Sequence, residues 1–221
     1  MFKAVLFDMD GTLVDSEKLW DVAMHAFYAQ KGGVLTDAVR ETTVGGSAEN
    51  VMRIVYDDLG LDPTPESMAE SADWLHVYTG ELFEQGLPWR PGAQELLETL
   101  AASGIPLALV TNTRRTLTEQ ALKTIGSHYF TVTVCGDEVP DGKPHPAPYL
   151  RAADLLGVAA EDCLAIEDSV TGAQSADAAG CVVLVVPNDV AVPDGPRRRH
   201  IESLAGLGVA DLRDIYTEIC S

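Results

Sequence analysis

The sequence has few basic residues and few aromatic ones. It holds 15 Lys and Arg against 34 Asp and Glu, which gives its 221 residues a formal net charge of -19 at pH 7. A field of that sign repels polyanions, so neither nucleic acid nor an anionic membrane surface is expected as a partner. A small anionic ligand would need positive charge concentrated at its own binding site.

Cysteine is scarce as well. The four cysteines lie at positions 135, 163, 181 and 220 and show no Cys-x-x-Cys spacing. Cys163 and Cys181 adjoin or begin apolar runs typical of buried strands. These features favour reduced thiols in a cytoplasmic protein over a disulfide framework.

Long hydrophobic runs are missing near the start. The apolar run after Lys3 is interrupted by Asp8, too early for a signal peptide or a membrane span. Hydrophobic residues nevertheless make up 46% of the chain, which indicates a globular protein. A chain of this length can bury a sizeable core, as one domain or as a core carrying a smaller insertion.

The most informative stretch runs from Val5 to Asp15. A short apolar run, typical of a buried strand, ends there in Asp8, Asp10 and Gly11. In open α/β sheets the functional residues lie at such strand ends. Because residues i and i+2 of a strand share a face, both aspartates should face one crevice. Two carboxylates so close need a cation or a shared proton, and they suit a nucleophile paired with a general acid and base.

Residues 16–88 have helical spacing, as in Leu19, Val22, Ala23, Ala26 and Phe27, and are predicted to be an all-helical insertion. Glycine-rich breaks divide the segment into four predicted helices; they lie at 31–33, 45–46, 60–65 and 86–88. All three tryptophans fall in this segment or at its exit, and for Trp74 packing between helices is the favoured interpretation.

From Pro91 onward strands and helices alternate, which predicts parallel strands joined by crossover helices. Strands are expected at 105–110, 129–134, 163–166 and 181–186. Helices should alternate with these strands. The first is expected over 92–102, and the second begins with a capping box of Thr116 and Glu119. The third is opened by Pro148, and the fourth is Ala-rich and ends at 179–180. The run 197–200, Arg-Arg-Arg-His, is interpreted as a solvated loop.

The predicted fold is therefore α/β: a doubly wound, parallel, Rossmann-like sheet in residues 1–15 and 89–221, with the helical insertion at 16–88. Three further polar clusters follow apolar strands and should converge on the edge that holds Asp8 and Asp10. They are Thr111-Asn112, Lys143, and Glu167-Asp168-Ser169. Carboxylate oxygens without a His or Cys cluster favour Mg²⁺ over zinc, and the whole set suits phosphoryl transfer.

Taken singly, each cluster has a simpler interpretation. Thr111 and Asn112 could form a turn that starts a helix, Lys143 could be a solvated loop residue, and Glu167 with Asp168 could cap the next helix.

Together, these motifs resemble those of the haloacid dehalogenase superfamily phosphatases. The four motifs occur in order, as Asp8-Met9-Asp10-Gly11-Thr12, Thr111, Lys143 and Glu167-Asp168, and the likeness covers residues 1 to about 187, with a helical cap inserted after the first motif. The resemblance implies that Asp8 attacks phosphorus and that Asp10 protonates the leaving oxygen and then activates water. It also implies phosphate binding by Thr111, Asn112 and Lys143, and Mg²⁺ held by Asp8, the main-chain carbonyl of Asp10, Glu167 and Asp168.

Within the family, the resemblance leaves the beta-phosphoglucomutases as a rival branch of isomerases. These use a His ten residues after the second aspartate, an Arg in a Gly-x-Ser-Arg cap loop and a later cap Lys. This chain has Trp20 at the first position and Gly45-Gly46-Ser47-Ala48 at the loop, and no lysine between Lys31 and Lys123. Arg40 or Arg53 could replace one missing charge.

The leading hypothesis is thus a Mg²⁺-dependent phosphomonoesterase, with Trp20, Gly45 and Gly46 facing the substrate from the cap. The segment Asp15 to Trp20 resembles that of sugar and hexitol phosphatases, which suggests a sugar or polyol phosphate as the small phosphorylated metabolite. A mutase is the first alternative and a non-catalytic phosphate-binding protein the second. No obligate protein partner is evident from the sequence.

Overall fold

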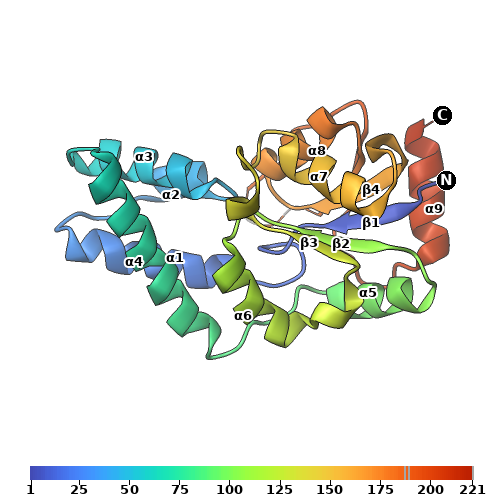
Figure 1. Cartoon of the computed structure of the whole chain (residues 1–221), viewed down its shortest axis with the longest axis horizontal. Helices are drawn as coiled ribbons and strands as arrows, with labels where there is room; N and C mark the ends of the chain where they lie inside the picture. Colours follow the sequence, from blue (N-terminus) through green and yellow to red (C-terminus); the bar gives the residue numbers. More distant parts are fainter. Residues whose placement is uncertain (187, 189, 221) are drawn as a thin grey trace.

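The core of the molecule is a parallel sheet of six strands in the order β3-β2-β1-β4-β5-β6 (Figure 1). The computed structural model describes residues 1–186, 188 and 190–220. The strands are β1 (Ala4–Phe7), β2 (Leu107–Val110), β3 (Val132–Val134), β4 (Cys163–Glu167), β5 (Val182–Val185) and β6 (Arg198–His200). The chain runs outward from β1 through β2 to β3 and then returns to the other side of β1, so a crevice opens beyond the carboxyl ends of β1 and β4.

Helices cover both faces of the sheet. Helices α5 (Ala93–Ala102), α6 (Arg115–Ile125) and α9 (Val209–Cys220) pack on one face, and α7 (Ala147–Leu156) and α8 (Val170–Ala179) pack on the other. Side chains alternate along β1, so Val5 and Phe7 join the first layer and Ala4 and Leu6 the second. This three-layer arrangement confirms the predicted α/β fold.

Residues between β1 and α5 form the predicted helices: α1 (Glu17–Gln30), α2 (Asp37–Thr43), α3 (Ala48–Leu59) and α4 (Pro65–Phe83). Thr36, Ser47 and Thr64 cap the last three, each accepting a hydrogen bond from a backbone N–H in the first turn. The four helices share a separate hydrophobic cluster, against which Trp74 packs. They lie at one end of the sheet (Figure 1). We call this helical unit the cap.

The run of basic residues at 197–200 is not the solvated loop that the sequence predicts. Arg198 to His200 form β6, an edge strand parallel to β5, with Val183 N–H donating to the Arg197 carbonyl and Ile201 N–H to the Val185 carbonyl. The Arg198 side chain is only 8% exposed because its guanidinium binds Asp177 and the carbonyl of Pro193. Backbone pairing with β5, together with the hydrogen bonds and the ion pair of Arg198, stabilises a strand in a run whose positive charge suggested a solvated loop.

The predicted capping box at the start of α6 is also wrong, although the helix itself is present. The N-cap residue is Arg114, and the backbone N–H of Arg115 donates to Asp137 of the neighbouring loop at 2.9 Å. The hydroxyl of Thr116 instead forms a 2.5 Å hydrogen bond with His76 of the cap. A tertiary contact therefore replaces the local one.

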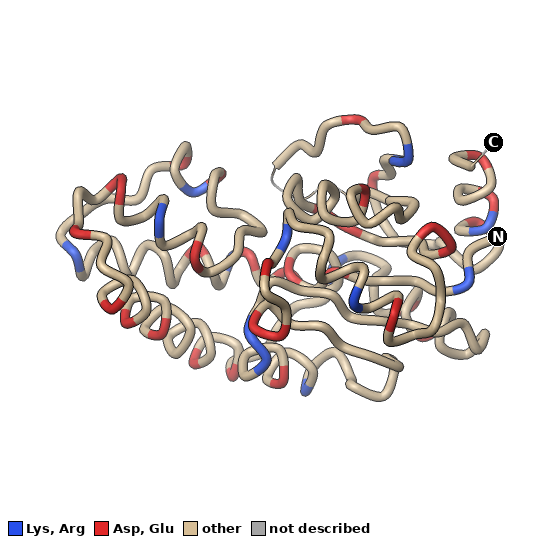
Figure 2. The backbone as a smooth tube through the Cα atoms, turned by 45° about the horizontal axis from the view of Figure 1, so that its top comes forward, with Lys and Arg blue, Asp and Glu red and all other residues tan. Residues whose placement is uncertain are grey.

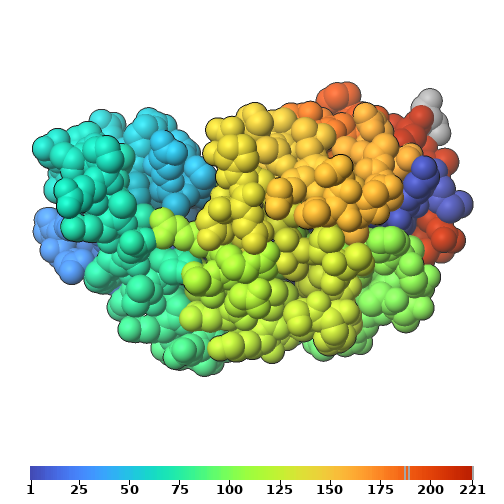
Figure 3. Space-filling view, viewed as in Figure 1, coloured from blue at the N-terminus to red at the C-terminus, as the bar shows by residue number. Residues whose placement is uncertain are grey.

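Acidic side chains are distributed over both the core and the cap and outnumber the basic ones throughout (Figure 2). Among the described residues, none of the helices combines the length and the apolar character required to cross a bilayer. The space-filling view shows that the surfaces of α4 in the cap and α6 in the core adjoin, so cap and core are in contact on that side (Figure 3).

Candidate active site

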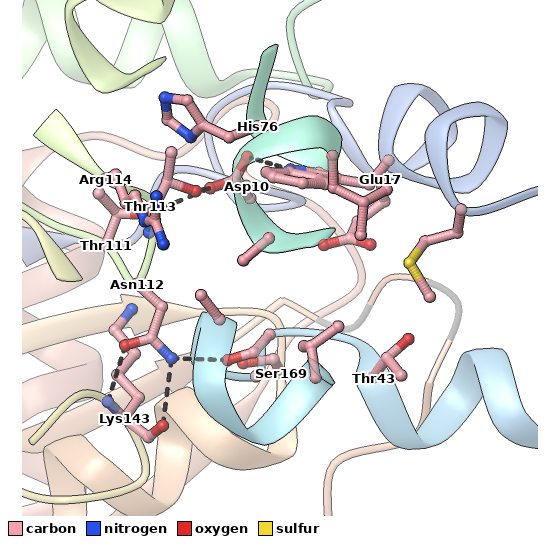
Figure 4. Close-up of a pocket in the computed structure, with 18 of the residues that line it drawn as sticks. Asp10, Glu17, Thr43, His76, Thr111, Asn112, Thr113, Arg114, Lys143 and Ser169 are labelled. Atoms are coloured by element: carbon pink, nitrogen blue, oxygen red, sulfur yellow. Dashed lines mark hydrogen bonds between the residues drawn. The ribbon is translucent and has the colours of Figure 1, made fainter. Parts of the chain in front are cut away.

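A pocket of about 890 Å³, open to solvent, lies between the cap and the carboxyl ends of the strands (Figure 4). Asp8 and Asp10 both line it, as their spacing predicts, and so do Thr111, Asn112 and Lys143. The cap residues Trp20, Gly45 and Gly46 line it as well. The structure therefore brings these predicted site residues to one place.

Four buried residues are joined by hydrogen bonds at this site, and two of them, Asp8 and Lys143, line the pocket. The ammonium of Lys143 donates to Asp8 Oδ1 at 2.5 Å and to Glu167 Oε1 at 2.6 Å, and Tyr149 Oη donates to the same Glu167 oxygen at 2.6 Å. Burial alone would lower the pKa of Lys143, but the charges of Asp8 and Glu167 outweigh it and raise that pKa. Lys143 is therefore a permanent cation beside Asp8, in a chain with few cations.

Asp8, Glu167 and Asp168 could together bind a metal ion, because one carboxylate oxygen from each lies within 4.8 Å of the others. Burial raises the pKa of Asp8 and of Asp168, and repulsion among the carboxylates adds to both shifts. A divalent cation relieves that repulsion, and an all-oxygen donor set suits Mg²⁺. The residues present therefore fit the predicted ion. That the main-chain carbonyl of Asp10 also binds the ion stays a prediction.

Gly11 makes room for this cluster. Its φ is +82°, and a Cβ at this position would come within 2.1 Å of Asp168 Oδ2. Only glycine combines this backbone conformation with so close an approach. The chain can therefore turn away directly after Asp10 while the side chain of Asp168 packs against Gly11.

Asp10 is surrounded by hydrogen-bond donors. Ser16 Oγ and Trp20 Nε1 donate to its Oδ1, at 2.6 and 3.3 Å. Thr111 Oγ1 and Thr113 Oγ1 donate to its Oδ2, at 3.2 and 2.8 Å. Donors from the cap side and from the β2 loop thus fix the carboxylate between them, at the point where a leaving oxygen would sit.

The side chain of Asn112 lines the pocket and bonds to the backbone of two loops. Its Oδ1 accepts from the Lys143 backbone N–H at 2.7 Å, and its Nδ2 donates to the carbonyls of Lys143 and Gly45. The amide therefore holds the Lys143 loop in place and ties it to the cap. A phosphate contact by Asn112, as predicted, would fall to its main-chain N–H.

The Gly45 carbonyl also accepts a hydrogen bond from Thr171 of α8, at 2.9 Å. Gly45 has a φ of +67°, and a Cβ there would lie 2.7 Å from Thr171 Oγ1, so this junction requires glycine. The cap loop between α2 and α3 is thus attached to the core by two side-chain donors.

Four residues of the site were not singled out by the sequence. Ser16 and Thr113 contact Asp10, Tyr149 contacts Glu167, and Thr171 contacts Gly45. Thr113 shares the loop of Thr111, which is a signal that could have revealed it. Tyr149 offers none, because one helical tyrosine has the same pattern in a core as in a site.

Comparisons with known proteins point to one family. The model of the haloacid dehalogenase-like hydrolases matches residues 2–180. A phosphoglycolate phosphatase of Yersinia pestis is 33% identical over 181 residues, which are 81% of this chain and 78% of that protein. A phosphorylated carbohydrates phosphatase of Thermotoga maritima is 32% identical over 80% of this chain and 82% of that one.

Among solved structures, CbbY from Rhodobacter sphaeroides, in complex with phosphate, superposes with a TM-score of 0.82. CbbY is 29% identical to this chain, and the match covers 96% of this chain and 100% of CbbY. The fold is Rossmann-like, and the matching family model is that of a class of hydrolases. The chain belongs to the haloacid dehalogenase-like hydrolases, which confirms both the resemblance and the predicted enzyme class, a phosphatase of that family.

Proposed function

We propose that the protein is a Mg²⁺-dependent phosphomonoesterase that acts on a small phosphorylated metabolite, a sugar or polyol phosphate, through an aspartyl phosphate on Asp8. The observation that carries the proposal is the position of Asp8. Its carboxylate contacts Lys143, lies in the carboxylate cluster with Glu167 and Asp168, and shares the pocket with Asp10. A nucleophile, charge for a phosphate and a proton donor thus meet at one end of the pocket.

In the first step, a carboxylate oxygen of Asp8 attacks phosphorus and the bond from phosphorus to the ester oxygen breaks. Asp10 gives its proton to the leaving alcohol. Lys143 and Thr111 bind the oxygens of the phosphoryl group. Mg²⁺ bound by Asp8, the Asp10 carbonyl, Glu167 and Asp168 would offset negative charge on the transferring group.

In the second step, Asp10, now a carboxylate, takes a proton from water, and the water oxygen attacks the phosphorus of the aspartyl phosphate. The acyl phosphate bond breaks, so Asp8 is regenerated and inorganic phosphate leaves. The donors around Asp10 hold its carboxylate in one place for both proton transfers.

We further propose a division of labour between residues 1–15 and 89–221, which carry the chemistry, and the cap at 16–88, which excludes water and selects the leaving group. The hydrogen bonds of Asn112 and Thr171 to Gly45 support a cap that closes on the core.

The surroundings of the cap favour hydrolysis over isomerisation, because a mutase must hold a second phosphate. Arg40 lines the pocket, but its guanidinium is bound to Glu17 and Asp21. Arg53 is exposed and donates to Asn50. Neither cation is thus presented to a second phosphate.

Phosphate release from a panel of phosphorylated metabolites, with and without Mg²⁺, tests the proposal. Chelation should abolish release and Mg²⁺ should restore it. Full activity after exhaustive chelation would contradict the metal dependence. Rapid conversion of beta-glucose 1-phosphate in the presence of catalytic glucose 1,6-bisphosphate, without phosphate release, would identify a mutase instead.

A further inference from the structure

The wall of the pocket that faces the reacting groups from the cap is largely apolar. It comes from α1, α3 and α4 and consists of Trp20, Met24, Val51, Met52, Ala72 and Leu75. Met24, Met52 and Leu75 are at most 4% exposed and belong to the hydrophobic cluster of the cap. The cap core thus continues directly into the part of the pocket where a leaving group would lie.

The charged residues that the cap adds to this pocket compensate one another. Arg40 donates to Glu17 Oε2 at 2.6 Å and to Asp21 Oδ1 at 3.0 Å, so one guanidinium serves two carboxylates. Glu17 is buried and Arg40 nearly so, with a side chain that is 15% exposed. A carboxylate or phosphate on the leaving group would meet a guanidinium that is already bound to two carboxylates.

The other basic side chains among the described lining residues are already paired. His76 forms its hydrogen bond with Thr116, and burial lowers its pKa, which disfavours the imidazolium form. The guanidinium of Arg114 binds Asp73 of α4 at 2.5 Å. Lys143 is engaged with Asp8 and Glu167, where the phosphoryl group is expected.

From these contacts we infer that the alcohol released by this enzyme is uncharged and presents an apolar face to Val51, Met52 and Leu75. The pocket therefore selects against phosphomonoesters that carry a carboxylate or a second phosphate, including 2-phosphoglycolate. The inference rests on the proposed function, since it concerns the leaving group of that reaction.

A matched series of alkyl phosphates tests the apolar wall. We expect kcat/KM to rise from ethyl to butyl to hexyl phosphate by about three- to fourfold per methylene, which is the transfer free energy of one buried CH₂. The hexyl ester is then compared with 5-carboxypentyl phosphate, which has the same chain length and ends in a carboxylate. The carboxylate should lower kcat/KM at least about tenfold, because its charge would be desolvated without a partner.

Two variants assign the effect to the pocket. Val51→Thr keeps the shape of the side chain and replaces one methyl group with a hydroxyl. It should therefore reduce the preference for hexyl over ethyl phosphate. Val77→Thr is its matched control, because Val77 is 61% exposed on α4 and does not line the pocket. Ala48→Arg places a cation at an exposed lining position and should raise kcat/KM for 5-carboxypentyl phosphate without raising it for hexyl phosphate.

The outcomes separate this inference from the proposed function. A steep rise with chain length and poor turnover of the carboxylate support it. Equal kcat/KM along the series, or equal turnover of the carboxylate, in an enzyme that releases phosphate from ethyl phosphate would overturn the inference and leave the proposed function intact. Failure to release phosphate from any monoester with Mg²⁺ present would overturn both.

Discussion

At the scale of single residues, the most distinctive contact is that between Trp20 and Asp10. Trp20 belongs to the cap and Asp10 to the core, yet the indole N–H donates to the carboxylate at 3.3 Å. The same indole lines the pocket. We infer that Trp20 positions Asp10 and also forms part of the wall that a substrate would meet.

Replacing Trp20 with Phe keeps an aromatic ring and removes the donor. Because hydrogen bonds to charged groups contribute about 1.5–3 kcal/mol and this one is long, we expect kcat to fall about three- to tenfold. The Mg²⁺ concentration for half activity and the Tm should stay unchanged. Steady-state kinetics with Mg²⁺ titration checks this, and Trp74→Phe is the control, since Trp74 packs on Phe27 and Tyr78 inside the cap. An unchanged kcat in Trp20→Phe would contradict the positioning role.

The positions of Asp8, Asp10, Thr111, Glu167 and Asp168 could be predicted from the sequence, because each lies at or just after the end of a short apolar run and parallel strands bring their carboxyl ends together. Lys143 lies farther along the loop that follows β3. The contacts of individual side chains could not be predicted. The amide of Asn112 bonds to Gly45 and to the Lys143 loop, and these partners lie on loops distant in sequence.

At the scale of elements, the cap loop between α2 and α3 contacts the core next to predicted site residues. It is held by Asn112 and Thr171 through one acceptor, the carbonyl of Gly45. We propose that closure of the cap depends in part on these two hydrogen bonds.

Thr171→Val removes one of these hydrogen bonds at nearly constant volume. A net contribution of about 0.5–1.5 kcal/mol predicts a decrease of about two- to tenfold in kcat/KM. The decrease should appear mainly in KM, because the reacting groups are untouched. Thr99→Val is a matched control on α5, where the hydroxyl bonds only to the Glu95 carbonyl of its own helix. Equal kcat/KM for Thr171→Val and the native chain would show that this contact does not contribute to closure.

Elements were predictable where they bury an apolar face. The glycine breaks between the four cap helices and the apolar strands β1, β2, β4 and β5 agree with the structure. Strand β6 was not predictable from hydropathy, because it is an edge strand made of Arg198, Arg199 and His200. Its stability comes from backbone pairing with β5 and from the ion pair of Arg198 with Asp177, both of which require the folded sheet.

At the scale of the whole molecule, the formal charge of -19 opposes folding through self-repulsion. Raising monovalent salt from about 10 to about 150 mM shortens the Debye length from about 30 to about 8 Å and should weaken this repulsion. We expect the Tm, measured by calorimetry in the presence of a chelator, to rise by about 2–4 °C, the shift that about 1 kcal/mol produces in a chain of this size. Sodium and potassium chloride should act equally, and a Tm that falls with either salt would contradict the prediction.

The central claim is that Asp8 carries the phosphoryl group between two steps in which Asp10 moves the protons. The most direct measurement uses Asp10→Asn with 4-nitrophenyl phosphate, whose leaving group needs no proton donor, followed by acid quenching and mass spectrometry of the peptides. Because the amide cannot activate water, the phosphoenzyme should accumulate, with one phosphoryl group on the peptide that contains Asp8 and none when Asp8→Asn is added. A phosphoryl group on another residue, or turnover in Asp8→Asn at the native rate, would contradict the account.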